Sequence, residues 1–355
     1  MKKLITLLLA LAMIFSLCAC GQPAEKTPEA EQPSADVPAE ADTPAQSDLP
    51  SYTIRLGDAA ASDSESGRAL AAFKAAVEEK SGGRITVELS LDGLLGSELE
   101  IFGQTQIGDL EMMAVGVGAE TSFLPQFGIL SLPYLFKDAA HKERAIMDPT
   151  VFDIIDSALI EAKDAHIVDV WEQGNRHLTA NTEVLHPTDI NGMKIRVPDN
   201  STFLLAWKAL GANVVTMGMG ELYTALQQHT CDGQENPLGV IKSQSLYEAQ
   251  DYIMLTGHVP NMRYILVNNT WWNSLPAEDQ ALITECVKEA GVQNDDEIHS
   301  NEQELISFFE GEGLTIVEVD TAEWVEAMNL EELVPSVSAE MGWDDAFNEA
   351  VLAVD

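Results

Sequence analysis

The chain alternates short apolar strands with amphipathic helices in two separate stretches. In the first, residues 52–57 and 84–90 alternate apolar and polar side chains like strands, and residues 69–77 between them place apolar side chains at helical spacing. The second stretch, residues 193–237, repeats strand, helix, strand and helix before a polar turn. This alternation is typical of parallel sheets covered by helices, so we predict an α/β fold with two similar halves.

The connections between the halves predict two lobes. The chain leaves the first half across residues 171–177, and the apolar runs at residues 251–256 and 262–267 are typical of strands that return to it. A helical pattern then covers residues 276–309, with a candidate break near Gly291. Because an average helix has only about 11 to 12 residues, we expect this one to run across both lobes.

The length and composition allow two domains with real cores, since 46% of the 355 residues are hydrophobic. We expect lobe I to comprise residues 51–173 plus about 262–301. Lobe II then comprises residues 174–261 plus about 302–355.

The first 50 residues predict a membrane tether. Lys2 and Lys3 precede a short apolar run, the pattern of a signal peptide over residues 1–19. The end of this run, Leu17-Cys18-Ala19-Cys20-Gly21, resembles a bacterial lipobox, which would place the lipid on Cys20. A plain secretory signal is the alternative. Residues 20–50 are rich in proline, alanine and acidic residues, so we expect a disordered spacer.

Charge and motifs exclude several function classes. The net charge of −39 makes nucleic acid a poor partner for the folded body. The four cysteines show no disulfide framework and no zinc spacing, and no dinucleotide loop or P-loop is present, so we expect no metal and no cofactor. Hydrolase motifs are also absent. We therefore predict a protein that is not an enzyme and has no catalytic residues.

Two polar residues are expected at the carboxyl edge of the second sheet. Arg196 ends a strand and Asn236 follows another, and open α/β sheets bind ligands at this edge. An arginine there can make two parallel hydrogen bonds to one carboxylate. The alternative is a structural ion pair between Arg196 and Glu235. Arg176 follows Gly174, where the backbone can approach a ligand closely.

Three further residues have a functional and a structural interpretation. Glu98 could accept hydrogen bonds from ligand hydroxyls, or it is an acidic residue placed favourably in the first turn of a helix. Met219 is either a pocket wall or a core residue. His258 could donate a hydrogen bond to an acid, although a lone histidine is more often structural.

An ordered series of motifs resembles the extracytoplasmic solute-binding proteins of TRAP (tripartite ATP-independent) transporters, the DctP family. The resemblance covers essentially everything after Pro50. It rests on Met193-Lys194-Ile195-Arg196-Val197-Pro198, Leu210-Gly211-Ala212, Glu221-Leu222-Tyr223-Thr224-Ala225-Leu226-Gln227, Asp232-Gly233-Gln234-Glu235-Asn236-Pro237, Tyr247-Glu248 and Leu255-Thr256-x-His258. It implies a two-lobed, periplasmic-binding-protein-like fold that closes around a small organic acid.

The resemblance also implies roles for individual residues. Arg196 would hold the ligand carboxylate, Arg176 would be a second arginine at the ligand, and Asn236 would complete the carboxylate site. Met219 would be an apolar contact. Glu235 and His258 would orient Arg196 in the closed state. The first lobe matches less well, and there Glu98 would favour a sugar acid over a dicarboxylate.

We therefore expect a lipid-anchored, extracytoplasmic binding protein that captures an organic acid and delivers it to a TRAP permease. The acid would be a C4-dicarboxylate, a keto acid or a sugar acid. An importer driven by ATP and a sensor that presents its ligand to a signalling receptor are the alternatives, because both use similar lobes. A secreted hydrolase would need a nucleophile or metal that the sequence does not show.

Overall fold

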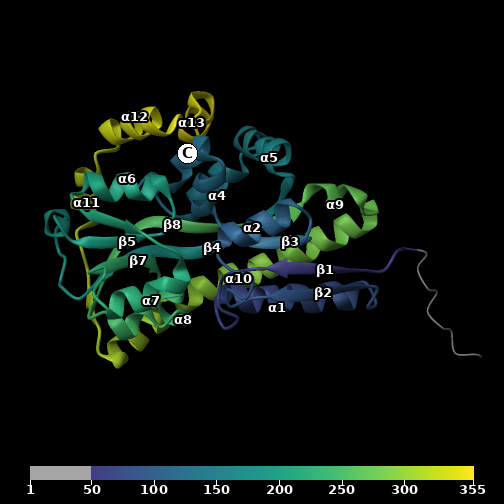
Figure 1. Cartoon of the computed structure of the whole chain (residues 1–355), viewed down its shortest axis with the longest axis horizontal. Helices are drawn as coiled ribbons and strands as arrows, with labels where there is room; N and C mark the ends of the chain where they lie inside the picture. Colours follow the sequence, from purple (N-terminus) through teal and green to yellow (C-terminus); the bar gives the residue numbers. More distant parts are fainter. Residues whose placement is uncertain (1–48) are drawn as a thin grey trace, which may run out of the picture. The chain divides into compact units, whose positions relative to one another are not determined.

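The computed structural model describes residues 49–355 (Figure 1). The expected signal peptide, Cys20 and the spacer up to residue 48 lie outside the described residues. Within the described part of the chain, every helix is too short or too polar to cross a bilayer.

The strands of the described residues form one mixed sheet. Its order is β2-β1-β3-β8-β4-β7-β5-β6, and β9 pairs with β8 outside this path. The strands are β1 (Tyr52–Gly57), β2 (Ile85–Ser90), β3 (Met112–Gly116), β4 (Ala165–Ala180), β5 (Lys194–Val197), β6 (Asn213–Thr216), β7 (Gly233–Pro237), β8 (Tyr252–Asn268) and β9 (Thr315–Val317).

The two ends of the sheet are parallel and its middle is antiparallel. At one end β1 pairs in parallel with β2 and β3, and at the other β5 pairs in parallel with β6 and β7. Between them β8 runs antiparallel to β3 and β4, and β4 runs antiparallel to β7. Two parallel α/β units joined by crossing strands confirm the predicted two-lobed α/β fold.

The crossing strands are longer than the sequence predicts. β4 has 16 residues and continues through residues 171–177, where the sequence indicates a crossing between the halves. β8 has 17 residues and joins the two strands expected at residues 251–256 and 262–267. Their mutual pairing shifts register at three places, one of them between Glu172 and Gly174. Gly174 has a φ of +82°, which glycine adopts at little cost. The polar, glycine-containing segments that resemble turns are therefore bulges within paired strands.

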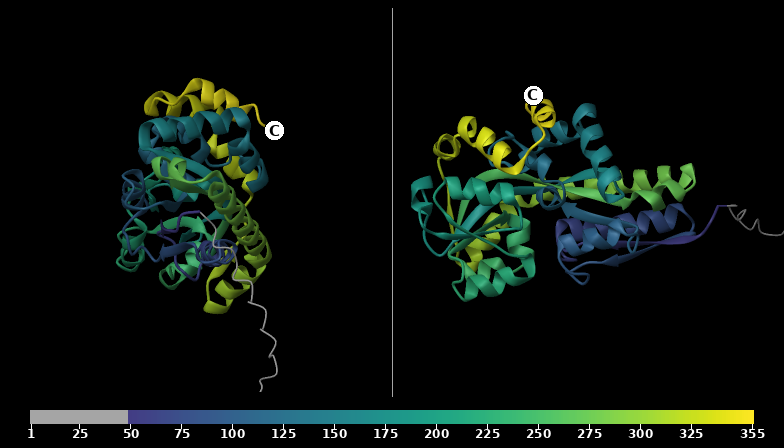
Figure 2. Two further views of the ribbon diagram at one scale, coloured as in Figure 1. Left: turned by 90° about the vertical axis from the view of Figure 1, so that its right-hand side faces the viewer. Right: turned by 45° about the horizontal axis from the view of Figure 1, so that its top comes forward.

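Helices cover both faces of the sheet (Figures 1 and 2). The α-helices are α1 (Glu65–Lys80), α2 (Glu98–Gln106), α3 (Glu120–Phe123), α4 (Ala139–Met147), α5 (Pro149–Lys163), α6 (Ser201–Ala209), α7 (Met219–Gln227), α8 (Leu238–Ser243), α9 (Asn269–Ser274), α10 (Ala277–Glu312), α11 (Thr321–Met328), α12 (Leu330–Met341) and α13 (Asp345–Leu352). Short 3-10 helices are η1 (Val117–Ala119), η2 (Pro125–Ser131), η3 (Pro187–Ile190) and η4 (Leu246–Ala249). The sequence pattern Ser97-x-x-Glu100 forms a capping box that opens α2.

The long helix α10 runs across both lobes (Figure 2). It is continuous over 36 residues, so the candidate break near Gly291 is wrong. A Cβ atom on Gly291 would lie 2.6 Å from Nε1 of Trp171, so glycine is needed there for close packing of α10 on β4. Ile283 of α10 packs in a core with β1 and β3, whereas Phe309 packs with α7 and α8.

The C-terminal helices close the core of the first half. Leu333 of α12 and Phe347 of α13 belong to the same buried cluster as Ile155 of α5 and Ile129 of η2. The boundaries expected between the lobes stay a prediction.

Candidate functional site

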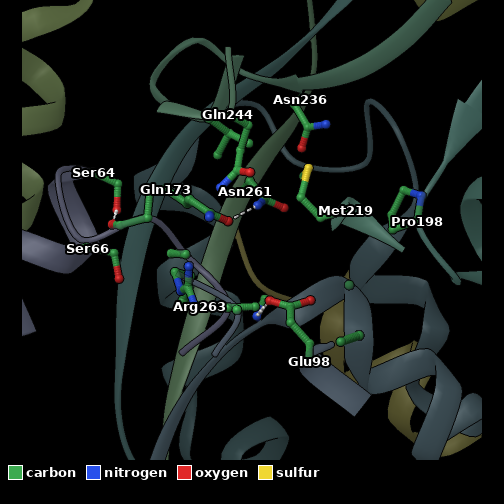
Figure 3. Close-up of a pocket in the computed structure, with 18 of the residues that line it drawn as sticks. Ser64, Ser66, Glu98, Gln173, Pro198, Met219, Asn236, Gln244, Asn261 and Arg263 are labelled. Atoms are coloured by element: carbon green, nitrogen blue, oxygen red, sulfur yellow. Dashed lines mark hydrogen bonds between the residues drawn. The ribbon is translucent and has the colours of Figure 1, made fainter. Parts of the chain in front are cut away.

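A cavity of about 640 Å³ lies where the crossing strands meet the carboxyl ends of the parallel strands. In Figure 3, Ser66, Arg263 and Glu98 lie on one side, while Asn236, Met219 and Pro198 lie on the opposite side. Pockets for small molecules typically measure about 300 to 1,000 Å³, so this cavity can enclose an organic acid of several carbons.

Three arginines line this cavity, and Arg196 of β5 is the one without an acidic partner among the described residues. Its side chain is 1% exposed, and its Nε and Nη2 donate to the carbonyl oxygen of Met217 at 3.1 and 2.5 Å. Its Nη1 is buried without any hydrogen-bond partner among the described residues. Burial lowers the pKa of Arg196 to about 10, against the opposing charge of Glu235, so the side chain remains a cation at neutral pH.

Glu235 of β7 pairs with Arg176 of β4 and not with Arg196. Nε of Arg176 lies 2.5 Å from Oε2 of Glu235, and Nη2 lies 2.8 Å from Oε1. Antiparallel pairing places Arg176 opposite Pro237, next to the Glu235-Asn236 segment. In this structure the backbone carbonyl of Met217, and not Glu235, holds Arg196. The expectation that Glu235 orients Arg196 in the closed state stays a prediction.

His258 of β8 contacts the Glu235 carboxylate of this ion pair. Its Nε2 lies 3.0 Å from Oε2 of Glu235, and its Nδ1 lies 2.8 Å from the hydroxyl of Thr256. Burial lowers the pKa of His258, so the neutral ring suits these contacts. Burial alone would raise the pKa of Glu235, but the charge of Arg176 and hydrogen bonds from His258 and Arg176 hold it at about 2. Glu235 is thus a firmly ionised, fully buried carboxylate.

Asn236 lines the cavity beside Arg176 of the ion pair. Its Oδ1 accepts a hydrogen bond from Nη2 of Arg176 at 3.1 Å, and its Nδ2 donates to Oε1 of Gln234 at 2.5 Å. These contacts fix the amide plane. Met219, the first residue of α7, supplies an apolar side chain to the same cavity.

Glu98 lies at the start of α2 on the lobe I side. Its Oε1 accepts a hydrogen bond from the backbone N–H of Gly116 at 3.0 Å. Burial raises the pKa of Glu98, and the nearby charge of Arg263 opposes this shift.

The structure brings the five expected ligand-binding residues to one cavity. Arg196, Arg176, Asn236, Met219 and Glu98 all line it. Glu235 and His258 lie behind it, each no more than 1% exposed. Their roles toward a ligand stay predictions.

Sequence reasoning missed Arg263, Gln173 and Asn261 at the cavity. Arg263 is 1% exposed and pairs with the buried carboxylate of Asp58. Nδ2 of Asn261 donates to Oε1 of Gln173 across the two crossing strands. Arg263 lies in an apolar strand, which is the same signal that identifies Arg196.

Neither cysteine of the described residues lines this cavity. No cluster of three or more potential metal ligands occurs among these residues. The thiols of Cys231 and Cys286 are buried, and burial raises the pKa of both.

Comparison with known proteins agrees with this architecture. The sequence model of the bacterial extracellular solute-binding proteins of family 7, DctP, matches residues 56–333. The sialic acid-binding periplasmic protein SiaP of Vibrio cholerae is 31% identical over 252 residues, which cover 71% of this chain and 78% of SiaP.

Solved structures of sugar-acid complexes share the fold. The sugar acid binding protein DctPAm of Advenella mimigardefordensis, in complex with galactonate, has a TM-score of 0.81 and 29% identity over 86% of this chain and 98% of its own. A TRAP periplasmic solute binding protein of Roseobacter denitrificans with bound L-galactonate has a TM-score of 0.77 and 28% identity over 86% of this chain and 100% of its own. The chain described here thus belongs to the DctP family of TRAP transporter solute-binding proteins.

Proposed function

We propose that this protein captures a small organic acid by binding its carboxylate to Arg196. The observation that carries this proposal is the buried Nη1 of Arg196, which has no partner among the described residues. A buried cation without a counter-charge is costly, and a ligand carboxylate supplies both the charge and the hydrogen-bond acceptor. Arg176 and Asn236 line the same cavity, where they contribute further donors.

A sugar acid is the ligand class that best fits the cavity. Of the three acids expected from the sequence, a C4-dicarboxylate would place negative charge near Glu98, whereas hydroxyl groups can donate hydrogen bonds to it. The relatives named above bind sialic acid, galactonate and L-galactonate. Another structural neighbour, from a Polaromonas species and 27% identical, is bound to D-erythronate.

Closure of the lobes retains the ligand for delivery to a TRAP permease. Excluding water strengthens each bond between an arginine and the carboxylate. Hydrogen bonds to charged groups contribute about 1.5 to 3 kcal/mol each, so two arginines and an amide support micromolar binding, about −8 kcal/mol. The protein acts by binding and release and changes no covalent bond in its cargo.

A thermal-shift screen identifies the ligand class. The panel contains dicarboxylates, keto acids, sugar acids, sialic acids and neutral sugars. A ligand at about 100 times its Kd adds about 2.7 kcal/mol of stability, which raises the melting temperature measurably. Stabilisation only by neutral sugars would contradict the proposal.

Calorimetry of Arg196→Ala then tests the residue that carries the proposal. We expect a loss of about 2 to 5 kcal/mol in the binding free energy of the acid found in the screen, because truncation removes one partner of a buried charge pair. Arg55→Ala is the matched control, since Arg55 is an exposed lobe I arginine that pairs with Glu111. Unchanged acid binding by Arg196→Ala would refute the assignment.

We propose further that a lipid on Cys20 anchors the protein outside the cytoplasmic membrane. The support is the sequence around Cys20, in which small Ala19 precedes the cysteine. Cys20→Ser should move the protein from the membrane fraction to the soluble fraction, while Cys18→Ser should leave it membrane-bound. Retention of Cys20→Ser on membranes would contradict the anchor.

A further inference from the structure

Arg263 of β8 faces the same cavity from lobe I. The sequence predicts no ligand-binding arginine in this lobe. Its side chain is 1% exposed and lines the cavity near Glu98 and Ser66 (Figure 3). Its backbone pairs with Gly116 of β3 on one side and with Trp171 of β4 on the other, so two strands fix its position.

Among the described residues, hydrogen bonds reach only Nη2 of the Arg263 guanidinium. Its Nη2 donates to Oδ1 of Asp58 and to the carbonyl oxygen of Ala114, the latter at 3.1 Å. Nε is buried without a partner, and no bond of Nη1 to a described residue is found. Asp58 is itself held by the backbone N–H of Ala60 at 2.9 Å and by the hydroxyl of Ser66 at 3.1 Å. The guanidinium is therefore oriented firmly, with donors to spare.

Glu98 supplies the complementary acceptor on the same side. Its Oε1 accepts from Gly116, and Oε2 has no hydrogen-bond partner among residues 49–355. Glu98 and Arg263 do not form an ion pair within 4.0 Å of each other, so the free groups of both side chains stay available to a ligand. A Cβ on residue 116 would lie 3.5 Å from Oε1 of Glu98, which leaves this carboxylate room beside the glycine.

We propose that Arg263 and Glu98 form a subsite for adjacent hydroxyl groups on the part of the ligand that extends into lobe I, a proposal that rests on the carboxylate-binding function above. A hydroxyl oxygen accepts from Arg263 while a hydroxyl hydrogen is donated to Glu98. A second carboxylate would suit Arg263 but would be repelled by Glu98 and Asp58. An alkyl chain would leave both polar groups unpaired. The subsite therefore selects a polyhydroxy monocarboxylate over the matching dicarboxylate.

Matched aldonates and aldarates test this selectivity by calorimetry. The pairs are D-galactonate with galactarate and threonate with tartrate, which differ only at the end remote from the first carboxylate. We expect the wild-type protein to bind at least one aldonate at least 10-fold more tightly than its aldarate. Glu98→Gln should reduce this ratio at least 10-fold, because it weakens aldonate binding and removes the repulsion of the second carboxylate.

Two further variants distinguish an effect on this subsite from a general effect of changing a charge in lobe I. Glu88→Gln removes an acidic charge from an exposed position of lobe I and should leave the ratio unchanged. Arg263→Lys keeps a cation beside Asp58 and should weaken aldonate binding more than 10-fold, because a lysine cannot satisfy Asp58 and a hydroxyl in the same geometry.

The outcomes distinguish this inference from the proposed function. Equal losses for aldonate and aldarate in Glu98→Gln, or a wild-type protein without preference for any aldonate, would overturn the subsite. Binding of acids other than aldonates that still depends on Arg196 would overturn the subsite and leave the proposed function standing. Acid binding that does not depend on Arg196 would overturn the proposed function itself.

Discussion

Both walls of the cleft contain buried arginines, and the protein neutralises Arg263 of lobe I but not Arg196 of lobe II. Arg263 and Arg196 are both 1% exposed. Arg263 has the carboxylate of Asp58, whereas Arg196 has only the carbonyl oxygen of Met217. The charge of the lobe I arginine is thus balanced within the folded structure, while the charge of the lobe II arginine is left for what binds there. Burial alone does not show which arginine charge a ligand must balance; the distribution of the acidic partners does.

Replacing each arginine with methionine should separate these two roles most strongly. Arg263→Met leaves Asp58 buried and unpaired, so we expect the free energy of unfolding to fall by about 3 to 5 kcal/mol. Arg196→Met removes an uncompensated buried cation together with its bonds to one carbonyl, so the net change should stay within about 1 kcal/mol. Urea denaturation of the ligand-free proteins measures both values.

Equal destabilisation by the two substitutions would contradict this comparison. It would mean that Arg196 also contributes its charge to the folded protein. Arg55→Met provides the baseline, because this exposed arginine lies outside the cleft and its surface ion pair contributes about 1 kcal/mol or less.

The sequence predicts the elements of this fold better than their connections. Local signals such as the capping box of Ser97 and Glu100 locate helices correctly, because each depends on residues a few positions apart. The long strands β4 and β8 are different. Gly174 and Gly257 both have positive φ angles and resemble turn residues, yet extensive pairing between the two strands keeps them within one sheet. Tertiary pairing overrides the local signal there.

The same limit applies to the cavity. Motif spacing brings Arg196 and Asn236 to one sheet edge, since both lie near the carboxyl ends of parallel strands of one α/β unit. The partner of a buried charge depends on contacts that are distant in sequence: Asp58 and Arg263 are 205 positions apart, and Arg176 and Glu235 are 59 apart. Sequence patterns indicate that a buried arginine needs a partner without identifying it, and in this structure Glu235 pairs with Arg176.

Arg176, like Arg263, is neutralised by a buried carboxylate, here Glu235. The dependence of stability on acidic pH should show this. The pKa of Glu235 falls from 4.5 to about 2, so its ionisation contributes about 3 kcal/mol to folding above pH 4.5. This contribution disappears as the pH falls from 4.5 toward 2. Glu235→Gln should therefore be less stable than wild type by about 3 kcal/mol at pH 7, with a smaller difference at pH 3. Urea midpoints across this range test it, and a difference that does not vary with pH would argue against the ion pair.

Glu98 should show the opposite pH dependence, with the smallest effect of the three. Burial raises the pKa of Glu98, and the charge of Asp58 adds to this shift, while Arg263 and the N–H of Gly116 oppose it. A folded-state pKa above 4.5 means that the folded protein binds the extra proton, so wild-type stability declines as the pH rises from 4.5 through that pKa. Glu98→Gln removes this decline and should gain stability relative to wild type toward neutral pH, as urea midpoints would show. A relative loss toward neutral pH would place Glu98 with Glu235 among the structural carboxylates, and the lobe I wall would then have no acidic group available for ligand hydroxyls. Glu235 and Glu98 thus divide as the charges of Arg263 and Arg196 do, into a charge balanced within the fold and a charge left for the ligand.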